Sequence, residues 1–298
     1  MTSFFDEIAR NRLKSVLLMC LFSGIFFLIV YAFVEYFGGG IFGLAIGAVI
    51  IIAYAAFSIF AGHKLVLKVS GAKEADRSKY PVLYDAVEGL AAASQVPMPK
   101  VYIIDDPNPN AFATGPNKKH AYVAVTTGLL AMMNKSELQG VIAHEMSHIY
   151  NNDIQFMMIA VVFAGAIGLL AAIIRNSLFF GFGGRRSNGG GYLLIVALIL
   201  SIVAPIVAFL IRLAISRRRE YMADANGGRI TRDPGSLASA LMKIKDYTSK
   251  PNAAPVKHAN DVTASLYFSS PLSVASISNL FSTHPPIDER IKKLKQMY

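Results

Sequence analysis

The sequence has little of two things that most soluble proteins of its size contain, cysteine and charge. Cys20 is the only cysteine among 298 residues, so no disulfide can form within one chain and no oxidising compartment is needed. Only 16% of the residues are charged, whereas 54% are hydrophobic. This composition is too apolar for an ordinary soluble protein of this length and indicates an integral membrane protein.

Charge is missing altogether from four long runs of the sequence. Each run has about 20 residues, which as a helix cover roughly 30 Å, the thickness of the hydrocarbon core of a bilayer. Buried helices of a soluble core are the alternative, but four helices that are apolar on every face are unusual there. The sequence therefore predicts four membrane spans, at 15–34, 41–60, 154–174 and 192–211.

The four runs form two hairpins that alternate with two more polar segments. We expect 1–61 to be an N-terminal membrane hairpin and 154–211 to be a second one. The polar segments 62–153 and 212–298 are expected to be the two parts of a catalytic domain on one side of the membrane, because an even number of crossings separates them.

Basic residues are distributed unevenly around the four runs. Lysine and arginine flank the first run, the second run and the fourth run, but the turn between the first two has none. Three arginines between the third and fourth runs weaken this asymmetry without reversing it. Because basic residues stay preferentially on the cytoplasmic side, both termini and both polar segments are predicted to be cytoplasmic. The net charge of +10 then indicates contact with anionic lipid rather than with nucleic acid.

A helix is predicted over 136–150, directly before the third run. Ser136 is its expected N-cap, with Gln139 three residues later as in a capping box. This helix carries the sequence HEMSH, in which two histidines stand four residues apart and therefore face the same way. That spacing is typical of a metal site on a helix.

The three polar residues of this motif have complementary chemistry. His144 and His148 can bind one zinc ion, and Glu145 lies about 100° around the helix, beside the open position of the metal. There its carboxylate can take the proton of a water that attacks a carbonyl. A purely structural zinc site is the alternative, but such sites favour cysteine.

Two histidines do not complete a catalytic zinc site, which needs a third protein ligand. The extended metzincin motif is excluded, because Asn151 and Ile154 stand where it requires glycine and histidine. Glu220 and Glu289 are the only glutamates downstream. Glu289 lies in an amphipathic helix and is expected to face solvent, so Glu220 is the predicted ligand; a surface partner of the neighbouring arginines is the alternative role.

Two aspartates are candidates to orient the histidines. Asp224 stands four residues after Glu220 and can accept the outward N–H of a ligating histidine. Asp153 is a candidate for the same role toward His148, or a simple cap of the third span.

The motifs HEMSH, SRRREYMADA, NAFATG and THPPIDERI together resemble the HtpX-type membrane zinc metalloproteases, bacterial relatives of the CAAX prenyl proteases. The resemblance covers nearly the whole chain. It implies a gluzincin-like domain with zinc on His144, His148 and Glu220, and with Glu145 as general base. It also implies a multi-pass protein of the bacterial inner membrane that cleaves misfolded or damaged membrane proteins at the cytoplasmic side, in protein quality control and stress response.

Two further features are candidates for a role in catalysis. Strands are predicted near 100–105, 110–114 and 120–126, and an exposed strand before the metal helix can pair with an extended substrate. The candidate residues for this substrate strand are Asn110, Ala111, Phe112 and Ala113, although an ordinary edge strand fits equally well. His284, before two prolines, is a candidate donor to the developing oxyanion, or else a capping or packing histidine.

The sequence thus predicts an α-helical multi-pass membrane protein of four spans with a cytoplasmic mixed α/β gluzincin-like zinc-protease domain that binds one zinc ion and cleaves protein substrates. A non-proteolytic zinc-binding transporter or assembly factor is one alternative. The lack of charge inside the spans argues against transport, and a positioned base has no use in a sensor. A narrow-specificity processing protease is a second alternative, which the sequence does not separate from broad quality control.

Overall fold

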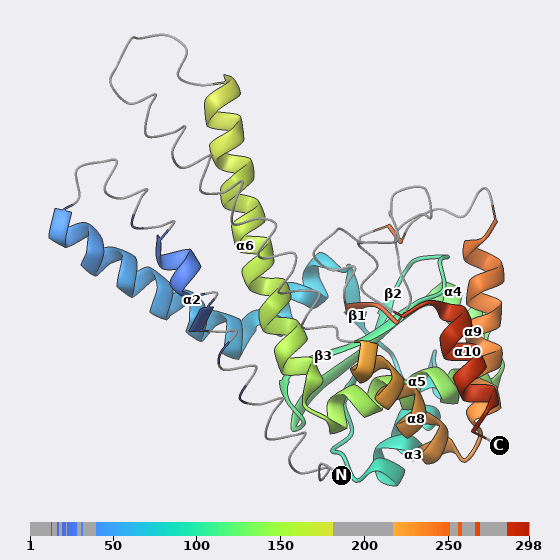
Figure 1. The fold of residues 1–298 in the computed structure, drawn as a ribbon. Coiled ribbons are helices and arrows are strands. Elements are labelled where there is room, and N and C mark those ends of the chain that lie inside the picture. Colours follow the sequence, from blue (N-terminus) through green and yellow to red (C-terminus); the bar gives the residue numbers. More distant parts are fainter. Residues whose placement is uncertain are drawn as a thin grey trace. The chain divides into compact units, whose positions relative to one another are not determined.

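The computed structural model describes residues 40–180, 217–250 and 285–297, the short stretches 256–257 and 266–268, and scattered residues between 13 and 31. By its contacts the chain divides into two compact units. Met1–Ala61 and Ile159–Leu213 form the first, and Gly62–Met158 and Ala214–Tyr298 form the second. Figure 1 labels the elements of both.

Within the described residues, one helix is long and apolar enough to cross a membrane, α2 (Gly40–Val69), which contains the second predicted span. The third predicted span falls on α6 (Asp153–Phe180), whose side chains are described as far as Ala166. In the first unit the two helices are joined by the Tyr54 hydroxyl, which donates to the carbonyl of Val162 at 2.7 Å. The fourth predicted span and half of the first lie outside the described residues, so the number of spans stays a prediction.

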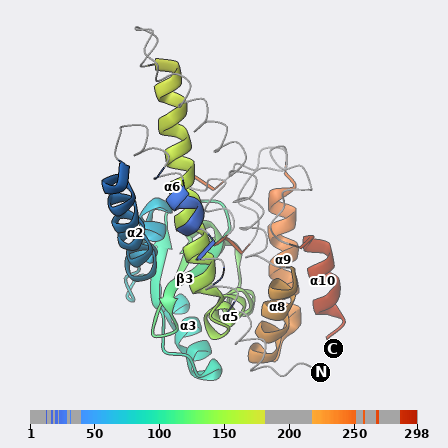
Figure 2. The ribbon, with the colours of Figure 1, turned by 60° about the vertical axis from the view of Figure 1, so that its left-hand side comes forward.

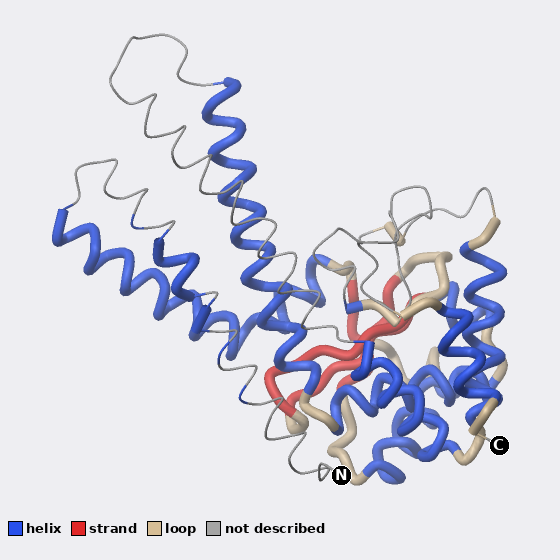
Figure 3. Tube along the Cα trace, in the orientation of Figure 1, coloured by secondary structure: helices blue, strands red, loops and turns tan. Residues whose placement is uncertain are grey.

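The second unit contains a four-stranded sheet in the order β1-β2-β4-β3. Its strands, drawn as red tube in Figure 3, are β1 (Ala72–Glu74), β2 (Lys100–Ile104), β3 (Ala111–Asn117) and β4 (His120–Thr126). β2 and β4 are parallel, whereas β3 pairs with β4 as an antiparallel hairpin and forms one edge. The three predicted strands are confirmed. β1 escaped prediction because its three residues carry no apolar alternation.

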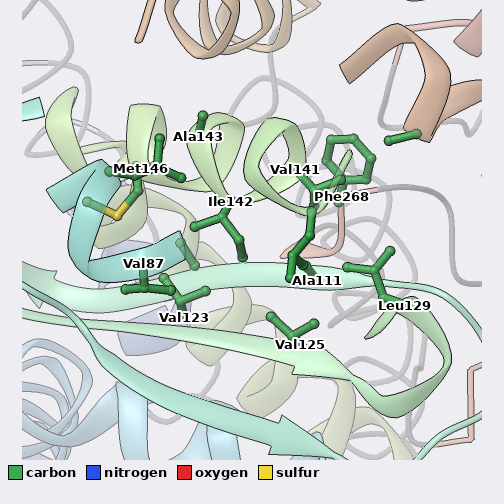
Figure 4. Close-up of a cluster of buried hydrophobic side chains, with 14 of the residues drawn as sticks. Val87, Ala111, Val123, Val125, Leu129, Val141, Ile142, Ala143, Met146 and Phe268 are labelled. Atoms are coloured by element: carbon green, nitrogen blue, oxygen red, sulfur yellow. The ribbon is translucent and has the colours of Figure 1, made fainter. Parts of the chain in front are cut away.

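One face of the sheet is covered by α3 (Pro81–Ser94) and α5 (Lys135–Tyr150). Figure 4 shows the resulting core, in which valines of β4 meet Val141, Ile142 and Met146 of α5. The buried face of α5 fixes the rotation of this helix, and with it the direction of its histidines.

The start of α5 differs from the prediction. Asn134 is the N-cap: its side chain accepts from the backbone N–H of Glu137 at 2.9 Å, and the Glu137 carboxylate accepts from the Asn134 N–H at 2.8 Å. The predicted cap at Ser136 was therefore wrong by two residues, because asparagine caps as well as serine and glutamate completes the box. Glu137 also accepts from Lys243 at 2.6 Å and from Ser239 at 2.7 Å, which ties α5 to α9 (Pro234–Thr248).

After β4 comes the short helix α4 (Thr127–Met132). The helices α8 (Arg217–Thr231), α9 and α10 (Ile287–Lys295) gather beside α5 in both views (Figures 1 and 2). Glycines allow the close approach. A Cβ on Gly227 of α8 would lie 3.2 Å from the backbone nitrogen of His144, and one on Gly140 of α5 would lie 2.9 Å from that of Leu237 in α9. Because of this close approach at Gly227, α8 packs directly against α5, the helix that carries His144 and His148.

The Gly140 contact makes a testable prediction about stability. Alanine favours a helix over glycine by about 1 kcal/mol, but Gly140→Ala is expected to destabilise the protein, since the new Cβ meets backbone atoms and overpacking costs about 1–3 kcal/mol. Gly89→Ala in α3 is the matched control, because nothing lies within 4 Å of its Cβ, and it is expected to stabilise. Thermal unfolding of both variants measures the difference, and a rise in Tm for Gly140→Ala would show that α5 and α9 are further apart.

Candidate metal centre

Two helices bring three buried ligands together. His144 and His148 of α5 direct their Nε2 atoms at one point, with 3.2 Å between them. Glu220 of α8 places Oε2 3.7 Å from Nε2 of His144 and Oε1 3.6 Å from Nε2 of His148. Each of the three residues is at most 5% exposed. Among the described residues they form a group able to hold a metal ion.

The spacing of these atoms fits one tetrahedral ion. With Zn–N bonds of about 2.0–2.1 Å, two ligands of a tetrahedral zinc lie about 3.3 Å apart. The 3.2 Å between the two histidines already matches this value, and the 3.6 and 3.7 Å to Glu220 require only a small contraction. Three protein ligands leave the fourth position for water or substrate, which is the pattern of a catalytic rather than a structural site.

Each histidine is oriented by a buried carboxylate on its other ring nitrogen. Nδ1 of His144 lies 2.9 Å from Oδ1 of Asp224, and Nδ1 of His148 lies 3.2 Å from Oδ2 of Asp153. A proton on each Nδ1 leaves the lone pair of each Nε2 for a metal. Asp153 reaches this position because the chain turns between α5 and α6 through Asn152, whose φ is +58°.

Arg290 of α10 is the residue that sequence reasoning missed. It is only 2% exposed and donates twice to Asp224, from Nε at 2.9 Å and from Nη2 at 2.7 Å. Its Nη1 lies 3.9 Å from Oε2 of Glu220. The sequence does contain an indication of this role. Arg290 lies on the same helix face as the apolar Ile287, Ile291 and Leu294, and a charged residue on a buried face needs a charged partner.

A second arginine stands behind the other histidine. Nε of Arg219 lies 3.9 Å from Oδ1 of Asp153, and its guanidinium lies 4.5 Å from the centre of the Phe156 ring. Both histidines are therefore backed by a carboxylate and then by an arginine. The two arginines compensate the negative charge that Glu220 and the aspartates bring into a buried site.

Glu145 is 2% exposed and is not among the three ligands. Burial raises the pKa of its carboxyl to about 7, with a contribution from the negative Glu220; the neighbouring His148 and a hydrogen bond from the Ala113 backbone act in the opposite direction. A carboxyl whose pKa lies close to neutral can both accept and return a proton, as a general base that later acts as an acid must.

The two histidines differ in charge when no metal is bound. Burial lowers the pKa of His144 to about 4, so its imidazole is neutral at pH 7. Burial disfavours the charged form of His148 as well, but its hydrogen bond to Asp153 and the negative Glu220 outweigh this and raise its pKa to about 9. A metal must therefore displace a proton from His148 at neutral pH.

This difference predicts proton release on metal binding. At pH 7.5 zinc binding is expected to release about one proton, and the affinity should rise about tenfold per pH unit until pH 9, above which His148 is already neutral. Calorimetric titration with zinc in two buffers of different ionisation enthalpy counts the protons. The Asp153→Asn variant should release fewer protons, because it lacks the negative charge that raises the pKa of His148. Heats that do not depend on the buffer would contradict this assignment.

The other predicted site residues are placed as follows. Asn110 directly precedes β3, and Ala111, Phe112 and Ala113 begin this edge strand. All four are at most 3% exposed, so the strand lies at an edge of the sheet, as predicted, but is not exposed. Ala113 is the member nearest the chemistry, through its backbone hydrogen bond to Glu145. Glu289 is exposed and accepts from the Tyr221 hydroxyl at 2.6 Å. His284 lies outside the described residues.

Comparison with known proteins identifies the family. The model of peptidase family M48 matches residues 78–298, the part of the chain that contains the metal centre. The chain belongs to peptidase family M48. It is a protease, and the predicted resemblance to the HtpX type is confirmed.

Similar proteins agree over the full length. "Protease HtpX homolog" of Caldanaerobacter subterraneus is 49% identical, covering 99% of this chain and 98% of that protein. The protein of the same name from Streptococcus thermophilus is 45% identical, covering 98% and 99%. The crystal structure of S. mikatae Ste24p has a TM-score of 0.50 and 19% identity, covering 97% of this chain and 67% of that one. This last likeness shows a common, mostly helical fold. The non-proteolytic alternative is not favoured.

Proposed function

We propose that this membrane metalloprotease of family M48 is an endopeptidase that holds one zinc ion on His144, His148 and Glu220. The observation that carries the proposal is the convergence of three buried donor atoms within 4.8 Å of one another, beside a carboxylate that is not a ligand. Two imidazoles with one carboxylate suit zinc better than the hard cations magnesium and calcium, which prefer oxygen ligands.

The roles of the residues follow from their positions. Bound zinc supplies a Lewis acid that polarises the scissile carbonyl and makes water a stronger nucleophile at neutral pH. Glu145 takes the proton of the attacking water and delivers it to the leaving amine. Asp224 and Asp153 keep Nδ1 of each histidine protonated, which fixes the tautomer and the direction of both rings. The prediction that His284 stabilises the oxyanion stays open.

The edge of β3 that faces away from β4 is the proposed binding place for the substrate backbone. β3 is the outer strand of the sheet, and an extended peptide can add to such an edge through main-chain hydrogen bonds. The hydrogen bond from Ala113 to Glu145 supports this role, since it sets the edge beside the catalytic base. A peptide paired there would carry its scissile carbonyl close to the three ligands.

We further propose that the substrates are misfolded or damaged membrane proteins, cut at the cytoplasmic face of a bacterial inner membrane by a protein of four spans. The apolar helix α6 supports this location, because it begins at Asp153, the residue that orients His148. A metal centre at the start of such a helix suits polypeptide that is in the membrane or emerging from it. Anionic lipid is the proposed partner of the basic residues beside the spans.

The test uses the full-length protein in detergent, stripped of metal by a chelator and reloaded with zinc. An unfolded soluble protein and a membrane protein with a destabilised span are offered as substrates, each beside its stable, folded form. We expect zinc-dependent cleavage of both unfolded substrates and little cleavage of the folded ones. Cleavage of neither, with zinc bound, would contradict broad quality control and favour a processing protease with one narrow substrate.

A further inference from the structure

The turn between β3 and β4 carries exposed positive charge. This turn, residues 117–120, is called the hairpin tip below. Its shape is set by Asn117, whose side chain accepts from the backbone N–H of Lys119 at 3.0 Å. Lys119 is exposed and Lys118 is half-buried. Residues 107–136 contain no aspartate or glutamate, so the sequence around the tip supplies no negative charge to balance the two lysines.

The hairpin contacts two segments that continue into predicted membrane spans. Nζ of Lys118 lies 4.7 Å from the ring centre of Tyr150, the last residue of α5, and α6 begins three residues later. The ring of His63 in α2 stacks on the ring of Tyr122 in β4, with 4.7 Å between the centres. All four residues belong to the second unit. The hairpin therefore contacts both segments close to the places where a predicted span ends or begins.

These contacts lie a short way along the chain from the predicted spans. His63 is three residues beyond the span 41–60, roughly 5 Å along a helix. Tyr150 is four residues before the span 154–174, at most about 14 Å of extended chain. The potential of an anionic membrane surface reaches outward over about 8–10 Å at physiological salt. The lysines of the hairpin tip are therefore expected within or near this range, where tyrosine is also enriched.

The end of α2 offers the same kind of surface. Beyond the predicted span, the exposed face of this helix consists of Lys64, Leu65, Lys68 and Val69. The leucine is 38% exposed and the valine 40%. His63 faces the sheet instead, and it lies within electrostatic reach of both Lys64 and His120, which joins this helix end to the hairpin tip. Lysines beside apolar side chains on one exposed helix face are typical of a segment at a membrane interface.

We propose that the hairpin tip and the end of α2 form one surface that binds the headgroups of anionic lipid, through Lys118 and Lys119 of the tip and through Lys64 and Lys68 of the helix. The inference rests on the proposed membrane location. Residues 40–73 also lack aspartate and glutamate except at no position, so charge complementarity favours a phosphate-bearing partner. The exposed apolar side chains beside the lysines favour lipid over a soluble polyanion, which would leave them in water. Because the tip ends β3, the contact holds this strand at the membrane surface.

The position of the tip can be tested with a fluorophore, because the sequence contains no tryptophan. His120→Trp places a single one at the tip. Lys292→Trp places one on α10, which lies on the other side of α5 and α8 from β3 (Figures 1 and 2). Each full-length, zinc-loaded protein is reconstituted into phosphatidylcholine bilayers that contain either phosphatidylglycerol or phosphatidylcholine with a quencher at the top of the acyl chain. We expect quenching at position 120 but not at position 292, and stronger quenching by labelled phosphatidylglycerol.

The role of the lysines is tested by removing their charge in the His120→Trp protein. Lys118→Gln with Lys119→Gln is expected to lower the preference for the anionic label about fivefold or more, since one lysine near an anionic surface contributes about a factor of five. High salt should lower the preference in the same way. Lys292→Gln with Lys295→Gln is the matched control, because it removes the same charge from α10, and it should leave the preference unchanged.

Two results would overturn the proposal. Absence of quenching at position 120 by either lipid would place the tip away from the membrane. Equal quenching by both lipids, unchanged by the lysine substitutions, would mean that the tip reaches the membrane without selecting anionic headgroups. The same samples are assayed for zinc-dependent cleavage of an unfolded soluble protein, which needs no lipid contact. Failure of that cleavage counts against the proposed function, whereas the quenching pattern decides the lipid contact.

Discussion

Glu145→Gln is expected to lower kcat by about 10²–10⁴-fold while leaving the bound zinc in place. Glutamine has the shape of glutamate and keeps an oxygen that can accept from the Ala113 N–H, but it cannot take a proton from water. Because Glu145 is not one of the three converging ligands, the substitution removes no metal ligand and the zinc should stay bound. The measurement is the steady-state rate on an unfolded protein, with the zinc content of both proteins determined.

Glu137→Gln is the matched control for this prediction. Glu137 is buried on the same helix, 3% exposed, and forms the capping box and the contact with Lys243. Its replacement should lower the Tm, because glutamine can keep the capping box but loses the ion pair with Lys243, and leave kcat near that of the wild type. If Glu145→Gln cleaved as fast as the wild type, another group would have to be the base.

Glu220→Ala is expected to weaken zinc binding by more than about 100-fold, which is the largest loss seen when a residue behind a ligand is removed. Two imidazoles alone bind zinc poorly at neutral pH, and the substitution also takes a negative charge away from Arg290, 3.9 Å from Glu220. Cleavage should disappear with the metal and return partly at high zinc concentration. Competition with a chromophoric chelator measures the affinity.

Glu289→Ala serves as the control for Glu220→Ala, because the two are the only glutamates downstream of the histidines. Glu289 is exposed and contacts Tyr221 at the surface, so its loss should change neither zinc affinity nor rate. Unchanged zinc affinity in Glu220→Ala would mean that the third ligand lies elsewhere.

The parts of the site that local spacing determines could be predicted from the sequence. His144 and His148 share a helix face because they stand four residues apart, and β3 is apparent from its apolar residues between turns. Glu220 required a longer argument, from the even number of crossings and the scarcity of glutamate. The structure places it beside both histidines, where Gly227 lets α8 approach the backbone of α5.

The parts that depend on tertiary contacts could not be predicted in the same way. Arg290 lies 66 residues from Asp224 in sequence, and no local pattern pairs the two. Phe268 reaches β3 through a single backbone hydrogen bond, which leaves no periodicity. The N-cap of α5 was predicted two residues too late because two overlapping pairs, Asn134 with Glu137 and Ser136 with Gln139, both fit a capping box. The structure uses the first pair, in which Glu137 also accepts a hydrogen bond from α9.

The central claim is that one zinc ion on His144, His148 and Glu220 makes this chain a protease. The most direct test strips the metal from the detergent-solubilised protein and returns zinc in steps, while bound zinc per chain and the rate of cleavage are measured on the same samples. The rate should start at background, rise in proportion to bound zinc and level off at one ion per chain. Full activity in protein without bound metal, or no activity once that single ion is bound, would contradict the account.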